Sequence, residues 1–282
     1  MAECHSVITF SCVDRPGIVH ALTGAVMNVR GNITELQQYT SPDTGCFFTR
    51  IQVEHDTPLE ELAVEVEAVA RRLGGTPTIN ELGRPVRTVV LVSQASHTLA
   101  ALLARRCAGT LPIDVKLVLG NHEELAPLAE FYRAPFEHHV IFPDTKAVVE
   151  QRIREVVDEH GIELVVLARY MQILSPELCE FLAGKAINIH HSFLPGFKGA
   201  NPYRQAHARG VKLIGATAHF VTSDLDEGPI IAQSVLPVDH SKDPGELREL
   251  GRDIESTTLL YAVRLFAEHR ILLDGIRTVI FE

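Results

Sequence analysis

The chain has 282 residues, of which 46% are hydrophobic and 22% charged, which is enough for two globular domains of ordinary size. Its formal net charge of −10 argues against a nucleic-acid partner, because binding to phosphates needs a basic surface. Five scattered cysteines without a CxxC pair argue against a disulfide framework, and neither a signal peptide nor a membrane-spanning run is expected, so a cytoplasmic protein without membrane partners is predicted.

The first 83 residues predict a small domain with the order βαββαβ. Alternating, β-rich segments predict strands at 5–12, 33–40, 46–54 and 78–82. Apolar residues at helical spacing predict helices at 18–29 and 59–73. A turn precedes the first helix and Gly31 follows it, which marks both of its ends. This order is typical of a ferredoxin-like domain.

From residue 84 onward the pattern changes, and it predicts a second domain over 84–282. Strands are predicted at 87–92, 113–119, 138–142, 164–168 and 186–189, and further β-rich segments lie at 214–221 and 230–238. A long helix is predicted at about 244–268. Several strands are continuously apolar, which is typical of a parallel sheet covered on both faces. The predicted fold class is α/β, with the ferredoxin-like domain followed by a Rossmann-like, mostly parallel sheet.

Polar residues of chemical interest follow the apolar strand that begins at residue 186. Asn188 and His190 are two positions apart, so on an extended chain their side chains point to the same side. Ligands bind beyond the carboxyl ends of parallel strands. An amide could stabilise a developing oxyanion, and an imidazole could move a proton near neutral pH. Asp226 could orient the imidazole or hold a water molecule.

Each of these residues also has a structural explanation, which the spacing alone favours. A strand that ends in Asn-x-His-His can serve the following turn, and Asp226 can be a turn residue before Gly228. His191 can be a structural histidine. Because adjacent residues on a strand face opposite ways, its side chain is expected to point away from His190.

A longer segment decides between these explanations. Residues 188–233 read NIHHSFLPGFKGANPYRQAHARGVKLIGATAHFVTSDLDEGPIIAQ. This segment resembles the folate-dependent formyltransferase superfamily in its NIHxS, LPxFKG, G-T-HFV and DxDxGxII motifs. The resemblance implies that Asn188, His190 and Asp226 form the catalytic group.

The same resemblance implies a substrate-binding site. Residues 168–175 resemble the segment that lines the folate pocket in the superfamily, although on their own they would indicate a helix-start loop with core side chains. The loop after the first strand of the second domain is SQASH at 93–97. It is expected to line the same cleft on the side where the acceptor of the formyl group binds. The implied substrate-binding residues are Ser93, His97, Arg169, Met171, Gln172, Leu174 and Gly199.

The N-terminal domain resembles an ACT domain. The resemblance rests on DRPGI at residues 14–18 and GNI at 31–33, and such a turn can also be purely structural. ACT domains bind small amino acids at domain interfaces and usually pair with one another. The resemblance therefore implies a homo-oligomer and an effector such as glycine or methionine. The implied effector-binding residues are Asp14, Arg15, Pro16, Gly17 and Asn32.

An ACT domain followed by a formyltransferase-type domain is the arrangement of superfamily members that hydrolyse formyltetrahydrofolate. The resemblance implies release of formate and tetrahydrofolate without a metal or cofactor, which supplies formate and balances the one-carbon folate pools. Relatives that use a phosphorylated acceptor have a Gly- and Asn-rich loop where this chain has SQASH. His97 could narrow the acceptor side, contact the water, or simply cap a helix. Formyl transfer to an amine and a non-catalytic amino-acid sensor are the alternatives.

Overall fold

The structure is a computed structural model that describes residues 4–194 and 202–282. Its contacts divide the chain into two compact units. The first contains residues up to 84 together with 268–282, and the second contains 85–267. The sequence pattern placed residues 268–282 in the second domain, whereas the contacts place them with the first unit.

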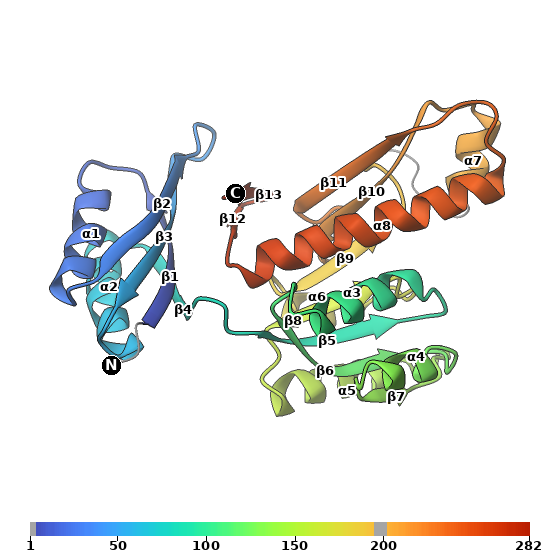
Figure 1. Ribbon diagram of the computed structural model, residues 1–282, viewed down its shortest axis with the longest axis horizontal. Helices are drawn as coiled ribbons and strands as arrows, with labels where there is room; N and C mark the ends of the chain where they lie inside the picture. The colour runs from blue at the N-terminus through green and yellow to red at the C-terminus, as the bar shows by residue number, and fades with distance from the viewer. Residues whose placement is uncertain (1–3, 195–201) are drawn as a thin grey trace. The chain divides into compact units, whose positions relative to one another are not determined.

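The first unit has the predicted ferredoxin-like order (Figure 1). Its elements are β1 (Cys4–Val13), α1 (Ile18–Asn28), β2 (Asn32–Thr40), β3 (Cys46–His55), α2 (Leu59–Leu73) and β4 (Thr76–Glu81). The strands form an antiparallel sheet in the order β2-β3-β1-β4. Both helices pack on one face of it, where Phe10, Leu22, Ile51 and Leu62 are among the buried core residues.

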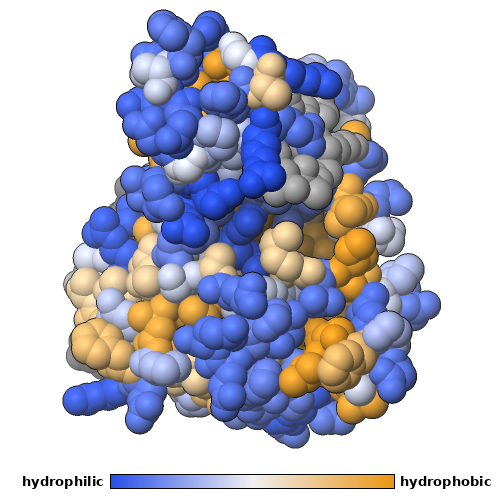
Figure 2. All heavy atoms as spheres, turned by 90° about the vertical axis from the view of Figure 1, so that its right-hand side faces the viewer, coloured by the Kyte–Doolittle hydropathy of each residue, from blue (hydrophilic) through white to orange (hydrophobic). Residues whose placement is uncertain are grey.

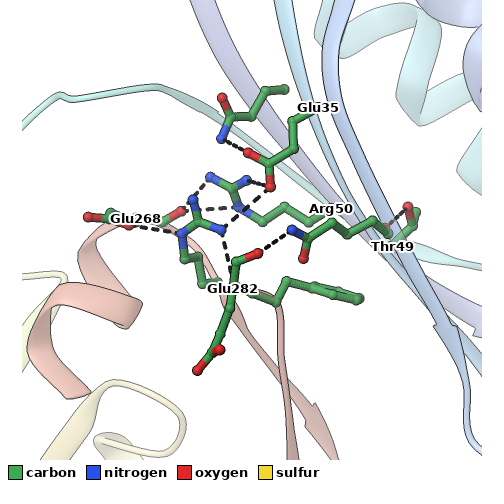
Figure 3. A network of polar contacts seen from close by, with 9 residues as sticks. Glu35, Thr49, Arg50, Glu268 and Glu282 are labelled. Carbon is green, nitrogen blue, oxygen red and sulfur yellow. Dashed lines mark hydrogen bonds and ion pairs between the residues drawn. The ribbon is translucent and has the colours of Figure 1, made fainter. Parts of the chain in front are cut away.

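The C-terminal residues pack with this unit through an apolar cluster and a buried arginine. Strands β12 (Ile271–Asp274) and β13 (Arg277–Ile280) form a hairpin, and Leu272 and Phe281 pack against Phe48. The fully buried Arg50 donates from Nη1 to Glu35 and from Nε and Nη2 to the backbone oxygen of Glu268, as Figure 3 shows. A buried guanidinium needs such partners, so these contacts tie residues 268–282 to the sheet.

The second unit is a seven-stranded sheet with helices on both faces. Its first elements are β5 (Val86–Val92), α3 (His97–Cys107), β6 (Ile113–Gly120), α4 (Ala126–Phe131), β7 (Phe136–His138), α5 (Lys146–Glu159) and β8 (Leu164–Ala168). Its remaining elements are α6 (Pro176–Phe181), β9 (Ala186–His190), α7 (Pro202–Ala208), β10 (Leu213–Phe220), β11 (Ile230–Pro237) and α8 (Pro244–Ala267). The order is β11-β10-β9-β8-β5-β6-β7, parallel from β7 to β9. The predicted fold class is confirmed.

One strand lies earlier than the sequence predicts. The apolar residues 138–142 indicated a strand, but β7 spans Phe136–His138. Its partner β6 ends at Gly120, which pairs with His138, so the residues after His138 have no neighbouring strand to pair with. Val140 and Phe142 are consequently exposed.

The strand order places a crevice where the site is expected. β5 pairs with β6 on one side and with β8 on the other, so the connections leave it in opposite directions. In open parallel sheets, ligands bind outside the carboxyl ends of the strands at this point. Residues of α5 and α6 pack on one face of the sheet, whereas α8 contacts β9, β10 and α3. In the described ranges, no helix is long and apolar enough to cross a membrane.

Candidate active site

A cleft of about 680 Å³ opens at the carboxyl ends of β5, β8 and β9. Most of the residues singled out in the sequence line it, although they lie far apart along the chain. They are His97, Arg169, Met171, Gln172, Leu174, Asn188, His190 and Asp226. The predicted catalytic trio therefore lies in one cleft with most of the predicted substrate-binding residues.

The cleft has an apolar part and a polar part. The apolar part includes Met171, Ile173, Leu174, Val221 and Leu225. The polar part contains His97, Tyr203 and Glu255 together with the cationic residues Arg204, Arg248 and Arg252. Figure 2 views the molecule from the side on which β5 ends and shows hydrophobic patches, mainly in its middle and lower parts, among mostly hydrophilic atoms. A flat, largely apolar ring system with one polar reacting end suits such a cleft.

Asn188 is oriented by a histidine on the neighbouring strand. β9 pairs antiparallel with β10, and His219 lies opposite Asn188. Nδ1 of His219 donates to the backbone oxygen of Phe220 at 2.8 Å, so in the neutral ring Nε2 is the acceptor. It accepts one amide N–H of Asn188 at 3.2 Å. The amide has two N–H groups, and the second has no partner among the described residues, so it is left for a ligand.

His190 and Asp226 form a second polar pair. Nδ1 of His190 lies 3.1 Å from a carboxylate oxygen of Asp226, and Nε2 is buried without a hydrogen-bond partner among the described residues. Burial raises the pKa of Asp226, but its contacts with His190 and His219 outweigh this effect and hold the pKa well below its usual range. Asp226 is therefore ionised, and Nε2 of His190 is the atom left for a ligand.

The turn that carries Asp226 has an unusual backbone. Asp226 has φ 58°, in the left-handed region that aspartate and asparagine tolerate better than most residues. A β-carbon at Gly228 would overlap the backbone oxygen of Phe220, so only glycine fits there. The DxDxG spacing thus brings the second aspartate onto His190.

His219 was missed by the sequence interpretation. It lies in the apolar strand β10 and is 2% exposed, although it was visible in the G-T-HFV motif. A polar residue inside a buried strand was the available signal, because a buried imidazole needs partners. Its partners come from β9 and from the turn of Asp226, which sequence distance conceals.

His191 differs from its prediction. Its side chain lines the same cleft as His190, and the two ring centroids are 5.1 Å apart. The alternation rule fails because β9 ends at His190 and the chain leaves the strand there. Burial, followed by the charges of Arg169 and His190, lowers the pKa of His191 to about 4. His191 is therefore neutral near pH 7.

This depressed pKa predicts a loss of stability in mild acid. An unfolded histidine takes up its proton near pH 6.5, whereas folded His191 does so only near pH 4. The unfolded chain therefore binds more protons between these values, and the free energy of unfolding falls as pH decreases through this window. Urea unfolding at pH 7 and pH 5 should show a smaller decrease for His191→Asn than for the wild type. Equal decreases would contradict the assignment.

The remaining predicted substrate-binding residues have different positions. Ser93 is buried behind the cleft, where its Oγ accepts the backbone N–H of Met171 at 2.9 Å, so it supports the 169–174 loop. Arg169 opens that loop with φ 62°, a strained conformation for arginine. Gly199 lies outside the described residues.

The predicted effector-binding residues do not all lie together. Residues 14–17 join β1 to α1, and Arg15 donates to the backbone oxygen of Leu73. Val13 pairs with Cys46 at one end of β3, whereas Asn32 pairs with Glu54 at the other. At the rise of an extended strand, these ends are about 25 Å apart. One chain therefore cannot bring Asn32 and residues 14–17 to the same small ligand.

Comparisons with known proteins agree with this architecture. A family model for formyl transferases matches residues 86–263, and one for the ACT domain matches 6–69. A formyltetrahydrofolate deformylase of Corynebacterium sp. (strain P-1) is 46% identical over 99% of this chain and 98% of its own, and one of Bacillus subtilis (strain 168) is 40% identical over 96% and 92%.

Solved structures give the same picture. A formyltetrahydrofolate deformylase from Burkholderia mallei ATCC 23344 has a TM-score of 0.95 and 48% identity, over 99% of this chain and 100% of that one. A glycinamide ribonucleotide transformylase from Symbiobacterium toebii has a TM-score of 0.66 and 31% identity, over 72% of this chain and 97% of that one. The first likeness covers both units, whereas the second covers less of the chain.

Proposed function

The chain belongs to the family of formyltetrahydrofolate deformylases, and on that premise we propose that it hydrolyses formyltetrahydrofolate to formate and tetrahydrofolate. The observation that carries the proposal is the convergence of three groups in one cleft. They are the free amide N–H of Asn188, the unpartnered Nε2 of His190 and the ionised carboxylate of Asp226. Hydrolysis of a formamide requires a hydrogen-bond donor to the oxyanion, a group that carries a proton, and an anion that orients the proton carrier.

The proposed reaction proceeds through a tetrahedral intermediate. The pterin lies against the apolar part of the cleft, with the formyl group beside Asn188 and His190. A water molecule held by the carboxylate of Asp226 attacks the formyl carbon and passes one proton to that carboxylate. The carbonyl oxygen becomes an oxyanion that accepts hydrogen bonds from Asn188 and protonated His190. The bond between carbon and nitrogen then breaks. His190 supplies a proton to the departing nitrogen and is reprotonated by the formic acid that forms. Formate then leaves, and Asp226 releases its proton to solvent.

A second candidate function is formyl transfer to an anionic amine acceptor. The arginines of the polar part, Arg204, Arg248 and Arg252, favour it because guanidinium groups bind phosphates and carboxylates well. The same cations would also suit the glutamate carboxylates of the folate substrate. Measuring formate with and without glycinamide ribonucleotide separates the two functions. Hydrolysis predicts steady formate release without the amine and no stimulation by it.

For the first unit we propose binding of an amino-acid effector, glycine or methionine, at residues 14–17. Backbone N–H groups at the start of α1 suit a carboxylate, and left-handed Gly17 leaves them without a side-chain cap. Asn32 could join this site only from a second copy, which fits a homo-oligomer formed through this unit.

Calorimetry with glycine and methionine tests this regulatory proposal. Binding accompanied by a change in the rate of formate release is the expected result. If neither amino acid binds and the rate stays constant, the unit is an assembly module instead.

A further inference from the structure

A carboxylate with no assigned role is buried in the polar part of the cleft. Glu255 lies on α8 and is 1% exposed. One carboxylate oxygen accepts a hydrogen bond from Nε2 of His97 at 2.8 Å, and the other accepts from the hydroxyl of Tyr203 at 2.7 Å. Nε of Arg169 lies 3.4 Å from the oxygen that binds His97. Glu255 therefore links α3, α7 and the end of β8.

The backbone of α8 is adapted to this arrangement. Gly251 precedes Glu255 by one helical turn, and a β-carbon at Gly251 would overlap the ring and hydroxyl of Tyr203. A glycine inside a helix destabilises it relative to alanine. The glycine permits Tyr203 to lie against the helix with its hydroxyl on Glu255, so two positions of α8 serve the same contact.

Burying this charge is costly, and packing alone does not require it. Replacing a buried ion pair by apolar side chains of similar volume is often neutral or stabilising. Burial raises the pKa of Glu255, but the hydrogen bond from His97, the charge of Arg169 and the hydrogen bond from Tyr203 together lower it below its usual value. The carboxylate is therefore ionised, and it holds two hydrogen-bond donors, His97 and Tyr203, and the charge of Arg169 in place at the wall of the cleft.

The position of these groups suggests what they do. His97, Tyr203 and Glu255 line the same cleft as Asn188 and His190. In the proposed reaction the apolar part holds the pterin, so the acceptor approaches the formyl carbon from the polar part. His97 cannot use Nε2 to hold the attacking water, because that atom is already bound to Glu255.

We propose that Glu255 determines the choice of acceptor by tying His97 to Tyr203, which closes the polar part of the cleft to amines and leaves room for water. This inference rests on the proposed hydrolysis. In the closed cleft the formyl carbon meets only water. In the opened cleft, an amine nitrogen bonds to the formyl carbon, the bond to the folate nitrogen breaks, and that nitrogen takes the proton that the amine loses.

The test is the partition of the formyl group between water and glycinamide, a small amine without a phosphate. Formate and formylglycinamide are measured together in one reaction by mass spectrometry. Wild-type protein is expected to form almost only formate, with a small, measurable amount of formylglycinamide. Glu255→Ala removes the carboxylate that joins His97 to Tyr203 and leaves its volume empty. The ratio of formylglycinamide to formate should therefore rise at least about tenfold. This factor corresponds to a change of about 1.4 kcal/mol in the difference between the two activation barriers.

Three further variants keep the inference testable if Glu255→Ala folds poorly. Tyr203→Phe removes only the hydroxyl that contacts Glu255 and should raise the same ratio by a smaller factor. Glu255→Gln preserves the shape of the side chain but removes its charge and one of its two acceptor oxygens, so it should raise the ratio by a smaller factor than Glu255→Ala. Asp253→Asn, on the exposed face of the same helix, is the matched control and should change neither product.

The outcomes separate this inference from the proposed function. A purely structural role would lower both products together and leave their ratio unchanged, which overturns the inference. Formate release by Glu255→Ala and Tyr203→Phe without any formylglycinamide also overturns it. If the wild-type protein releases no formate at all, the proposed hydrolysis fails and the inference fails with it.

Discussion

Replacing Asp226 by asparagine is expected to lower the rate of formate release by about 10⁴, the loss seen when a catalytic histidine loses the carboxylate that orients it. Nδ1 of His190 lies 3.1 Å from this carboxylate, whose ionisation balances the charge of a protonated imidazole. An amide at this position can offer an N–H to Nδ1 and so favour the wrong tautomer of His190. Single-turnover measurement of formate gives the loss directly.

Asparagine is the informative replacement because of the backbone at this position. Asp226 has φ 58°, which asparagine adopts readily and alanine does not. Asp226→Asn therefore isolates the charge, whereas Asp226→Ala adds strain in the turn. The matched control is Asp224→Asn, an exposed position in the same turn that does not line the cleft. Near-normal formate release by both Asp226 variants would remove Asp226 from the mechanism.

Asn188→Ala is expected to lower turnover by about 10²–10³, the usual effect of removing one oxyanion donor. Folding should persist, because Asn188 is only partly buried in the short strand β9. KM should change little, since the lost hydrogen bond strengthens only as the oxyanion forms. A large rise in KM at unchanged kcat would instead make Asn188 a residue that binds the ground state.

His219 provides a check on that interpretation. If it acts by orienting the amide of Asn188, then His219→Ala should lower turnover, but little further in the presence of Asn188→Ala. Additive losses would mean that His219 acts independently, through its contact with Asp226 at 3.6 Å. This distance is longer than a hydrogen bond, which favours action through Asn188.

The sequence predicted the elements whose signals are local. The helix at Leu59–Leu73 and the strand at Leu164–Ala168 have the predicted bounds, because a helix-breaking glycine follows the one and a continuous apolar run forms the other. The β12–β13 hairpin was missed because its strands are only four residues long, although they pair with each other across a local turn. Its packing against Phe48, far away in the sequence, could not be read from a local pattern. The position of β7 also could not be read from a local pattern, because it depends on where the neighbouring strand β6 ends.

The sequence predicted those residues of the site that belong to a recognisable motif. Asn188, His190 and Asp226 came from the resemblance, and the structure brings them together, but their catalytic roles remain proposals. His219 and Glu255 lie in a strand and a helix that look like ordinary core segments. Their polar partners are 31 and 158 residues away, at Asn188 and His97. Such buried networks follow from packing, which the sequence pattern alone does not specify.

The most direct test of the proposed hydrolysis is the stoichiometry of products from formyltetrahydrofolate when no amine is present. Formate and tetrahydrofolate are quantified over many turnovers with the purified full-length chain, and then again with glycinamide ribonucleotide added. We expect one formate for each tetrahydrofolate in both reactions and an unchanged rate. Tetrahydrofolate formed only when the amine is added, with the formyl group on the amine, would contradict hydrolysis and establish formyl transfer in its place.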